Sequence, residues 1–544
     1  MKNYFATKTF RQLLIPTMMT NLVTAVGSFS VAMIVGNLLD ERALSAVTLA
    51  NPAFMIINTI AAIFAVGGVT CLTQAKGRGE TKTSNQLFSM AILSLLFLSF
   101  VGIIFGLFFL DSLVYLLGTR EAAVKTLVTV YLRVILLGLP CFFLNTTLAF
   151  FVRTDGNPNL SMAGMLTAIV LEIILDVLFV QHFGVAGAAL GLVVAQFVSL
   201  GIISSHFLQQ KNTLHWHKPE FKLIFQIVQN GVGTSLSFIY QFLLLITFNN
   251  LIARFAGNDG IVAFSVVVNL TAIAMSLYEG ISQTVQPIIS VYYGEKYFQA
   301  VRLILKHAFQ VGAVLCVLVT VILEWQPDLI SRMFHVTSQP ALADSILGTQ
   351  IFAPAIIVMS FNALMSYFYQ TTERRLLAGA IVLLRGFLLP VLFGFLLGYQ
   401  LGLTGIWLAY PCAELATSVF ILVATGLIKR KEQLADRTLL PEAPLEYYFA
   451  GKSDQLDKPA FLQTLPEEAE FPAIFGQKLA ALLVKQPDAQ LELRIYHDED
   501  WLAILRTDQS LENQKEVPLI TDWQIEQQPI LGINRLLVRR EVPR

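Results

Sequence analysis

Charged residues are scarce in this chain. Of its 544 residues only 14% are Asp, Glu, Lys or Arg, whereas 55% are hydrophobic, and the mean hydropathy is +0.65. An ordinary soluble protein of this size carries nearly twice that share of charge. The composition therefore excludes a soluble globular protein and predicts a polytopic membrane protein.

Cysteine is also rare. Cys71, Cys141, Cys316 and Cys412 all fall inside apolar segments and lack metal-ligand spacing. This excludes a disulfide framework and predicts no metal site. The first ten residues lack a short apolar core followed by a small-residue cleavage site, so we expect no removable signal peptide.

Phosphate-binding motifs are missing as well. The chain after Lys431 has no glycine-rich phosphate loop, and the lone Gly532 followed by Asn534 does not predict nucleotide binding. We expect no enzyme activity, no cofactor and no nucleic-acid partner.

Long apolar runs are what the chain has in abundance. Windows of about 20 mostly apolar residues are long enough to cross a bilayer. The sequence holds twelve: 11–38, 43–75, 84–110, 122–152, 158–180, 184–208, 219–255, 260–292, 300–324, 341–370, 376–399 and 402–428. They predict an all-α polytopic membrane protein.

The basic residues fix an orientation for these spans. With the N-terminus inside, eighteen Lys and Arg residues fall in or beside inner loops, and five in the outer ones: Arg42, Arg120, Lys125, Arg254 and Arg332. Inner loops are normally the basic ones. We therefore expect a multi-pass protein of the plasma (inner) membrane with both termini in the cytoplasm.

Two halves of the chain resemble each other. Gly184-Val-Ala-Gly187 matches Gly402-Leu-Thr-Gly405, and Thr154-Asp155 matches Thr372-Glu373, both at an offset of 218 residues; Gly77 matches Gly294 at 217. Because a six-helix unit has an even number of spans, its two copies run parallel, as in some secondary transporters. We predict six-helix bundles over residues 1–210 and 211–430, with the substrate between them.

The remaining residues, 431–544, have the texture of a soluble domain. They hold 20 acidic and 13 basic residues and follow a linker marked by Pro441 and Pro444. Residues 472–486 have the pattern of an amphipathic helix, and 490–497, 501–507 and 535–540 that of strands. We predict a small cytoplasmic α+β domain, which is a candidate for binding a cytoplasmic partner.

Two acids interrupt the fifth apolar segment. Glu172 and Asp176 lie four residues apart, which places them on one helix face. A carboxylate at bilayer depth costs at least about 2.5 kcal/mol, so such residues are usually functional. Two neighbouring carboxyls in a low-dielectric cavity do not both ionise easily, so one holds a proton at neutral pH. We predict that the pair couples transport to protons, because a proton and a positively charged substrate in that cavity would compete for the same carboxylates; the alternative is a polar helix contact.

Other polar residues inside the spans are weaker candidates. Glu279 and Gln283 suit a cationic substrate, although a salt bridge from Glu279 to Arg385 is an equal alternative. Glu414 is a substrate-binding candidate for which a helix-packing contact is the preferred interpretation. Arg133 and Arg385 are expected to pair with these acids or with backbone carbonyls as structural or gating residues.

Several motifs taken together resemble one known family, the multidrug and toxic compound extrusion (MATE) transporters, over residues 10–430. The loop Arg153-Thr-Asp155-Gly156-Asn-Pro158 is similar to that family's signature after its fourth helix. Further similarities, in the family's order, are Tyr131-Leu-Arg133, Leu175-Asp176, Gly184-Val-Ala-Gly187, Gln283 with Gln286-Pro287, and Arg385 with Pro390. Arg153, Asp155 and Gly156 are thereby structural or gating candidates.

The resemblance implies a V-shaped pair of six-helix bundles that exports small cationic amphiphiles by alternating access, in exchange for protons or sodium. Three departures bear on the ion. The chain reads Ser30-Val31-Ala32 where many relatives have a first-helix aspartate, and it has Glu172 where the family often has asparagine. Leu192 replaces a threonine that often supplies an oxygen. Because sodium needs several hard oxygen ligands, protons are favoured, and sodium stays the alternative.

Two other functions remain open at this point. A flippase of lipid-linked oligosaccharide would have a similar fold, but it would need a strongly basic central cavity. A membrane sensor or regulator would use the acidic C-terminal domain to bind a cytoplasmic partner.

Overall fold

The structure is a computed structural model of the whole chain. It describes residues 4–38, 43, 46, 47, 49–116, 122–210, 212–325, 339–441, 445–452, 490–497, 501–508, 523–531 and 533–540. The predicted helix at 472–486 lies outside these residues.

Helices make up the membrane body. The first half contains α1 (Tyr4–Leu38), α3 (Asn51–Arg78), α4 (Thr81–Phe108), α5 (Leu110–Leu116), α6 (Ala122–Leu137), α7 (Leu139–Thr154), α8 (Pro158–Phe183), α9 (Val185–Ser204) and the 3-10 turn η1 (Ser205–Leu208). The second half contains α10 (Lys222–Ser235), α11 (Ser237–Gly294), α12 (Phe298–Trp325), α14 (Gln339–Phe352), α15 (Ala355–Thr371), α16 (Arg375–Leu383), the π-helical turn η2 (Leu384–Leu388), α17 (Leu389–Leu401) and α18 (Leu403–Glu432).

The helices of the described part account for the predicted spans. Nine helical segments are long and apolar enough to cross a bilayer, and the bent pairs α6 with α7 and α14 with α15 add two. α11 supplies parts of two spans, because its backbone kinks at Gly257, where φ is +59°. With α1, whose 35 residues exceed the length a crossing needs, the twelve predicted spans all have a counterpart.

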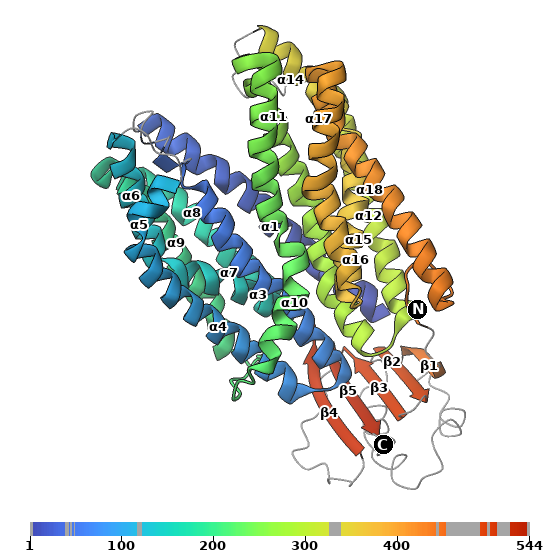
Figure 1. The fold of residues 1–544 in the computed structure, drawn as a ribbon. Coiled ribbons are helices and arrows are strands. Elements are labelled where there is room, and N and C mark those ends of the chain that lie inside the picture. The colour runs from blue at the N-terminus through green and yellow to red at the C-terminus, as the bar shows by residue number, and fades with distance from the viewer. Residues whose placement is uncertain are drawn as a thin grey trace.

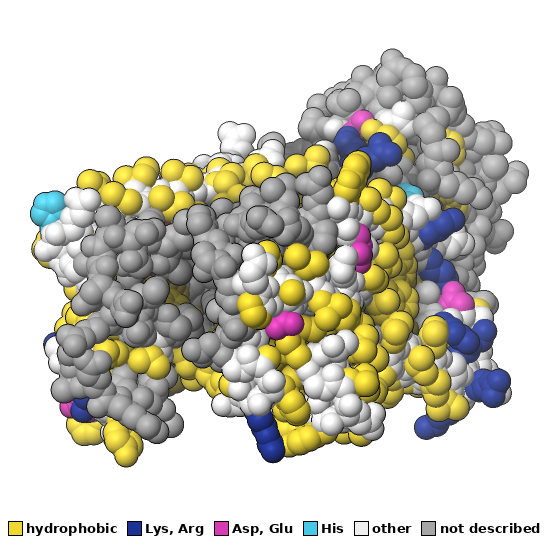
Figure 2. Space-filling view, turned by 90° about the horizontal axis from the view of Figure 1, so that it is seen from above, with side chains coloured by type: hydrophobic (Ala, Val, Ile, Leu, Met, Phe, Trp, Pro, Cys, Tyr) yellow, Lys and Arg dark blue, Asp and Glu magenta, His cyan; other side chains and the backbone are white. Residues whose placement is uncertain are grey.

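The two halves diverge from a common end (Figure 1). The helices of the first half, drawn in blue to teal, and those of the second half, drawn in green to orange, separate with distance from the β-sheet, which lies across their near ends. The side chains seen on the helical body are mostly hydrophobic, with Lys and Arg gathered mainly towards one side of the view (Figure 2). This V shape and apolar surface agree with the predicted fold class.

The C-terminal residues form an antiparallel five-stranded sheet in the order β1-β2-β3-β5-β4. Its strands are β1 (Leu445–Lys452), β2 (Gln490–His497), β3 (Trp501–Thr507), β4 (Trp523–Ile530) and β5 (Ile533–Arg540). The predicted strands at 490–497 and 501–507 are confirmed, and the one at 535–540 is two residues longer. β1 and β4, the two edge strands, were not predicted.

Candidate functional site

The acid pair lies on α8. This helix begins with Pro158, whose fixed φ suits a first helical turn, and ends before Gly184, whose φ of +58° and ψ of −137° stop the helix. Glu172 is 8% exposed and Asp176 is 0% exposed. Neither carboxylate oxygen of Asp176 has a hydrogen-bond partner in the part of the chain that the structure describes. Among the described residues no ion pair reaches either acid.

Protein rather than lipid encloses these carboxyls. α8 packs against α9 and α1. On α9, a Cβ built on Gly191 would lie 2.5 Å from Asp176 Oδ1, so only a glycine there leaves room for the carboxyl group. A buried charge without a partner is costly, so at least one of the two groups holds a proton or meets a cation.

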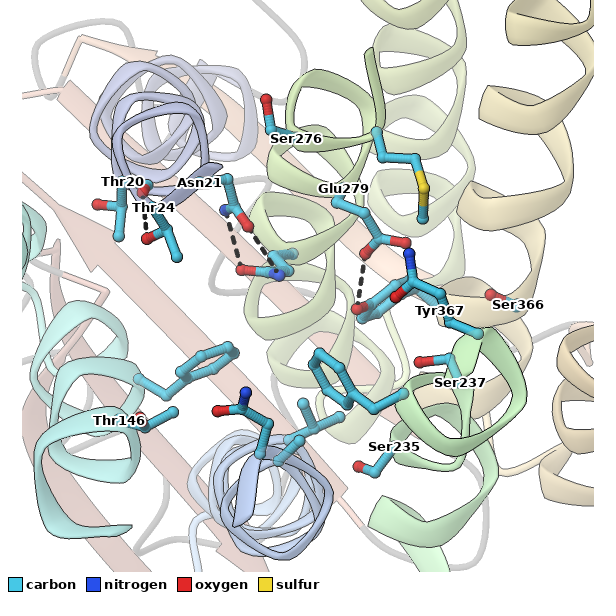
Figure 3. Close-up of a pocket in the computed structure, with 18 of the residues that line it drawn as sticks. Thr20, Asn21, Thr24, Thr146, Ser235, Ser237, Ser276, Glu279, Ser366 and Tyr367 are labelled. Carbon is cyan, nitrogen blue, oxygen red and sulfur yellow. Dashed lines mark hydrogen bonds between the residues drawn. The ribbon is translucent and has the colours of Figure 1, made fainter. Parts of the chain in front are cut away.

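A cavity of about 380 Å³ lies between the two halves, with its lining drawn from both (Figure 3). α1 contributes Thr20, Asn21 and Thr24, and α7 contributes Thr146. The second half contributes serines of α10 and α11, Glu279 on α11 and Tyr367 on α15. A volume of this size falls in the range of small-molecule sites.

Glu279 is the one acid among the described residues that line this cavity. Tyr367 Oη donates a 2.9 Å hydrogen bond to Glu279 Oε2, which fixes the carboxylate in the cavity wall. Gln283, one turn further along α11, exchanges two 3.2 Å hydrogen bonds with Asn21 of α1. The cavity therefore contains both substrate-binding candidates of α11, and the Asn21–Gln283 pair ties the halves together beside them.

Arg385 pairs with Glu414 and not with Glu279, the alternative partner suggested by the sequence. Its Nε donates to Glu414 Oε1 at 3.2 Å, and Asn362 Nδ2 donates to Glu414 Oε2 at 2.6 Å. Arg385 sits in η2, a π-helical turn, which is a local departure often found at functional sites. Glu414 does not line the cavity. The alternative salt bridge from Glu279 to Arg385 is therefore not formed, and Glu414 makes a contact between packed helices.

Arg153 lines the cavity from the end of α7. It is 5% exposed, its guanidinium lies 4.4 Å from the centre of the Phe150 ring, and its Nε has no hydrogen-bond partner among the described residues. The cavity thus contains one acid, Glu279, and one cation that no acid of the described chain pairs.

Asp155, in the loop after α7, anchors a buried polar network. Lys76 Nζ lies 2.6 Å from Asp155 Oδ1, and His206 Nε2 lies 2.9 Å from Oδ2. The backbone N–H of Thr213 donates to Oδ2 at 2.9 Å, and the Thr213 hydroxyl donates to Oδ1. Burial works to raise the pKa of Asp155, but Lys76 and these hydrogen bonds outweigh it and hold the pKa at about 2. Gly156 follows at a φ of +91°, which favours glycine.

Two expectations differ from the geometry. Arg133 was expected to pair with an acid or with backbone carbonyls inside a helix bundle, but its side chain lies on the exposed face of α6 and has no ion pair among the described residues. Glu172 and Asp176 were expected to share a chamber with the substrate, but neither lines the cavity, because their turns of α8 lie beyond Met165 and face α9 and α1.

Several residues around the cavity were missed from the sequence. Asn21, Thr24 and Tyr367 are polar side chains in apolar helices, and that is the only signal that marks them. Lys76, counted only as a loop charge, is buried at 3% exposure.

Comparison with known proteins gives concordant matches. The profile of the MatE family matches twice, over residues 16–178 and 234–396. The two matches begin 218 residues apart, the same offset as the repeats noted in the sequence. Relatives include the multidrug export protein MepA of Staphylococcus saprophyticus and that of Staphylococcus aureus, each 23% identical over 422 residues, which is 76% of this chain and 92% of the relative.

Solved structures share the fold. The crystal structure of a MATE transporter in complex with MaL6 superposes with a TM-score of 0.74 at 20% identity and covers 79% of this chain and 98% of its own. An outward-facing multidrug resistance MATE transporter gives the same TM-score and covers 79% and 97%. The two family matches together span more than half of the residues, so this chain belongs to the MatE family and is a multi-pass MATE membrane transporter, not an enzyme.

Proposed function

We propose that this transporter exports small cationic amphiphiles by alternating access in exchange for protons. The observation that carries the proposal is the pair of buried carboxyls on α8, which form no ion pair with any described residue, on a helix whose residues Ser161 and Met165 line the cavity between the halves. The name of the MepA relatives, multidrug export proteins, supports the substrate class.

Glu279 is the proposed contact for the substrate cation. It faces a cavity whose other described lining is hydroxyl, amide, methionine, aromatic and small aliphatic groups, apart from Arg153 and the Glu414-paired Arg385. Such a wall accepts an apolar body and directs one positive charge to one carboxylate. The lining is not strongly basic, so it does not favour the flippase alternative.

Coupling has to act through a helix, because Glu172 and Asp176 do not line the cavity. α1 packs against α8 and carries Asn21, which bonds to Gln283 next to Glu279. Protonation of the pair removes the charge that α8 presents to its neighbours and so alters the packing of α1. Binding of protons and substrate then favours opposite access states, which makes the exchange obligatory.

The orientation is part of the proposal. The sheet and the N-terminal end of α1 lie at the same end of the molecule (Figure 1). The positive-inside rule makes this end cytoplasmic in the inner membrane.

The test is export of a fluorescent organic cation by the full chain in lipid vesicles, first under a pH gradient alone and then under a sodium gradient alone. Export driven by the pH gradient and lost in Asp176→Asn supports the proposal. Glu324→Gln, which alters an exposed acid of α12, is the control and should export normally. Export driven only by sodium, or normal proton-driven export by both Asp176→Asn and Glu172→Gln, would overturn it.

A further inference from the structure

The two halves of the membrane body contact each other at the end where the C-terminal β-sheet lies, called the sheet end below. A Cβ built on Gly77 of α3 would lie 2.4 Å from Val291 O and 3.0 Å from the Cα of Gly294 on α11. Gln74 Nε2, on α3, donates to Thr371 O of α15 at 2.8 Å. These contacts bring the two helix ends together as closely as backbones allow, and they must break if access is to move to this end.

One face of the C-terminal sheet points three arginines at that closure. Arg494 of β2, Arg506 of β3 and Arg535 of β5 are at most 2% exposed. Arg506 pairs with Arg535 of β5 on one side and with Glu492 of β2 on the other. Arg494 follows Glu492 by two residues on the same strand. All three arginine side chains therefore lie on the same face of the sheet. Three buried guanidiniums in a small domain need an anion.

Their shared partner belongs to the membrane body. Glu295 directly follows α11 and is 0% exposed. Arg494 Nη2 donates to Glu295 Oε2 at 2.6 Å, while Arg506 Nη2 and Arg535 Nη1 donate to Oε1 at 2.7 and 3.0 Å. Tyr292 accepts a 2.5 Å hydrogen bond from Arg506 Nη1, and the Arg506 guanidinium lies 4.2 Å from the centre of the Tyr292 ring. The sheet is thus held on the second half by a charged, desolvated contact.

Arg535 also reaches the first half. Its Nη2 donates to Lys76 O at 2.7 Å and its Nη1 to Gly77 O at 3.2 Å. These carbonyls lie in the last turn of α3, where helix carbonyls lack partners within the helix and attract cations. A single guanidinium therefore bonds to both halves next to the Gly77–Gly294 crossing.

We propose that the C-terminal sheet is a clamp that holds the sheet ends of the two halves together, with Arg535 as the residue that joins them and Glu295 as its anchor. The clamp favours the state in which the cavity is closed towards the sheet. This inference rests on the alternating access of the proposed function and gives the C-terminal domain a role in setting it.

The physical reason is the number of buried charges. When the halves part at the sheet end, Arg535 must leave either the α3 carbonyls or Glu295, and Glu295 leaves the arginines if the whole sheet lifts. Removing one partner from a buried charged contact leaves the other charge buried without compensation, which costs far more free energy than a contact that was never formed. A sheet that only packed against one half would need Glu295 and the apolar contacts, but it would not need the bonds to Lys76 O and Gly77 O.

The test measures distances between the halves in the full chain in lipid vesicles. Fluorophores carried by unnatural amino acids at Lys82 and Lys306, both exposed near the sheet end, report that end; a pair at the exposed Phe108 and Trp325 reports the far end. The variants are Arg535→Gln and Glu295→Gln. The matched control is Arg302→Gln, because the 2.7 Å Arg302–Asp436 pair joins α12 to the linker without crossing to the first half.

In Arg535→Gln, the population with a long Lys82–Lys306 distance should rise by roughly tenfold or more, because the loss of a hydrogen bond to a charged group changes an equilibrium constant by about that factor. The Phe108–Trp325 distance should shorten in parallel, and Arg302→Gln should match the wild type. Unchanged distances in Arg535→Gln, or the same change in Arg302→Gln, would overturn the clamp. If Glu295→Gln does not fold, Arg535→Gln alone decides, because it leaves Arg494 and Arg506 on Glu295.

Cation export by the wild type in the same vesicles separates the two proposals. Normal export with unchanged distances in the variants rejects the clamp only, whereas distances that shift as expected without any proton-driven export reject the proposed function only.

Discussion

Gly187 and Gly405 make the same close contact in the two halves of the molecule. A Cβ built on Gly187 would lie 2.1 Å from Phe179 O, and one built on Gly405 would lie 2.0 Å from Leu397 O. The two glycines lie 218 residues apart along the chain, and so do Phe179 and Leu397. Each glycine lets the first turn of one helix, α9 or α18, rest directly on the backbone of the helix before it.

Substituting these glycines should therefore destabilise the protein. In Gly187→Ala and Gly405→Ala the methyl group would overlap a carbonyl oxygen, and overpacking of this kind costs about 1–3 kcal/mol. The thermal unfolding midpoint of the purified transporter should fall. Gly201→Ala in α9 and Gly426→Ala in α18 are controls, because no described residue lies within 4 Å of a Cβ at either position; their midpoints should stay level or rise. Equal midpoints for all four variants would show that the contact is not tight.

Asp155 should be worth far more to stability than an exposed acid nearby. Asp155→Asn leaves the buried Lys76 ammonium without its carboxylate, which costs about 3–5 kcal/mol for a buried pair. Glu80 forms a comparable but exposed pair with Arg78, at 3.0 Å, and Glu80→Gln should change stability by less than about 1 kcal/mol. Thermal unfolding of both variants at pH 7 tests the difference, and similar losses would contradict it.

The clamp should not respond to physiological pH. Burial works to raise the pKa of Glu295, but Arg506, Arg494 and Arg535 outweigh it and lower the pKa from 4.5 to about 2. A carboxyl with a lowered pKa contributes its full stability above its ordinary value and loses it only as the pH falls through the lowered one. Glu492, which lies 3.1 Å from Arg494 Nε, and Tyr292, which accepts a hydrogen bond from Arg506, do not change this sign. The Lys82–Lys306 distance should be constant between pH 5 and pH 8, and a transition within that range would contradict the assignment.

Glu279 should select for positive charge. In Glu279→Gln, affinity for a monovalent organic cation should fall by roughly tenfold or more, since a charge-assisted contact contributes about 1.5–3 kcal/mol. Affinity for an uncharged molecule of the same shape should change little. Tyr367→Phe keeps the carboxylate and removes only its hydrogen bond, so its effect on cation binding should be smaller. Binding of both compounds by titration calorimetry gives the comparison; equal losses for both would mean that Glu279 acts through cavity shape.

Much of the helical body could be predicted from the sequence because the bilayer imposes a length and an apolar character on each span. The window 158–180 became α8 (Pro158–Phe183), and 402–428 became α18 (Leu403–Glu432). The repeat could also be predicted, since Gly184 and Gly402 both need a backbone conformation that favours glycine, with φ of +58° and +61°.

The sheet could be predicted only in part. β2 and β3 are interior strands with alternating apolar residues, whereas β4 is an edge strand that carries three glutamines and Pro529. An edge strand tolerates proline and needs little apolar surface, so its sequence signal is weak. The contact of Arg494, Arg506 and Arg535 with Glu295 could not be predicted, because it depends on the strand register and on where the sheet docks.

The candidate site shows the same limit. The acids on α8 stand out because carboxylates are rare in apolar spans. Their separation from the cavity depends on which helices α8 packs against, and that is a property of the assembled fold. Tyr367 was missed because a tyrosine in an apolar helix has no distinctive pattern.

Proton movement caused by the substrate is the most direct test of the account. Vesicles containing the full chain and a pH-sensitive dye, with no initial gradient, receive an organic cation on one side. The account predicts that the wild type moves protons in the direction opposite to the cation. Asp176→Asn and Glu172→Gln should each move fewer protons by roughly tenfold or more, and Glu324→Gln should move as many as the wild type. Proton movement at the wild-type rate in both α8 variants would contradict it.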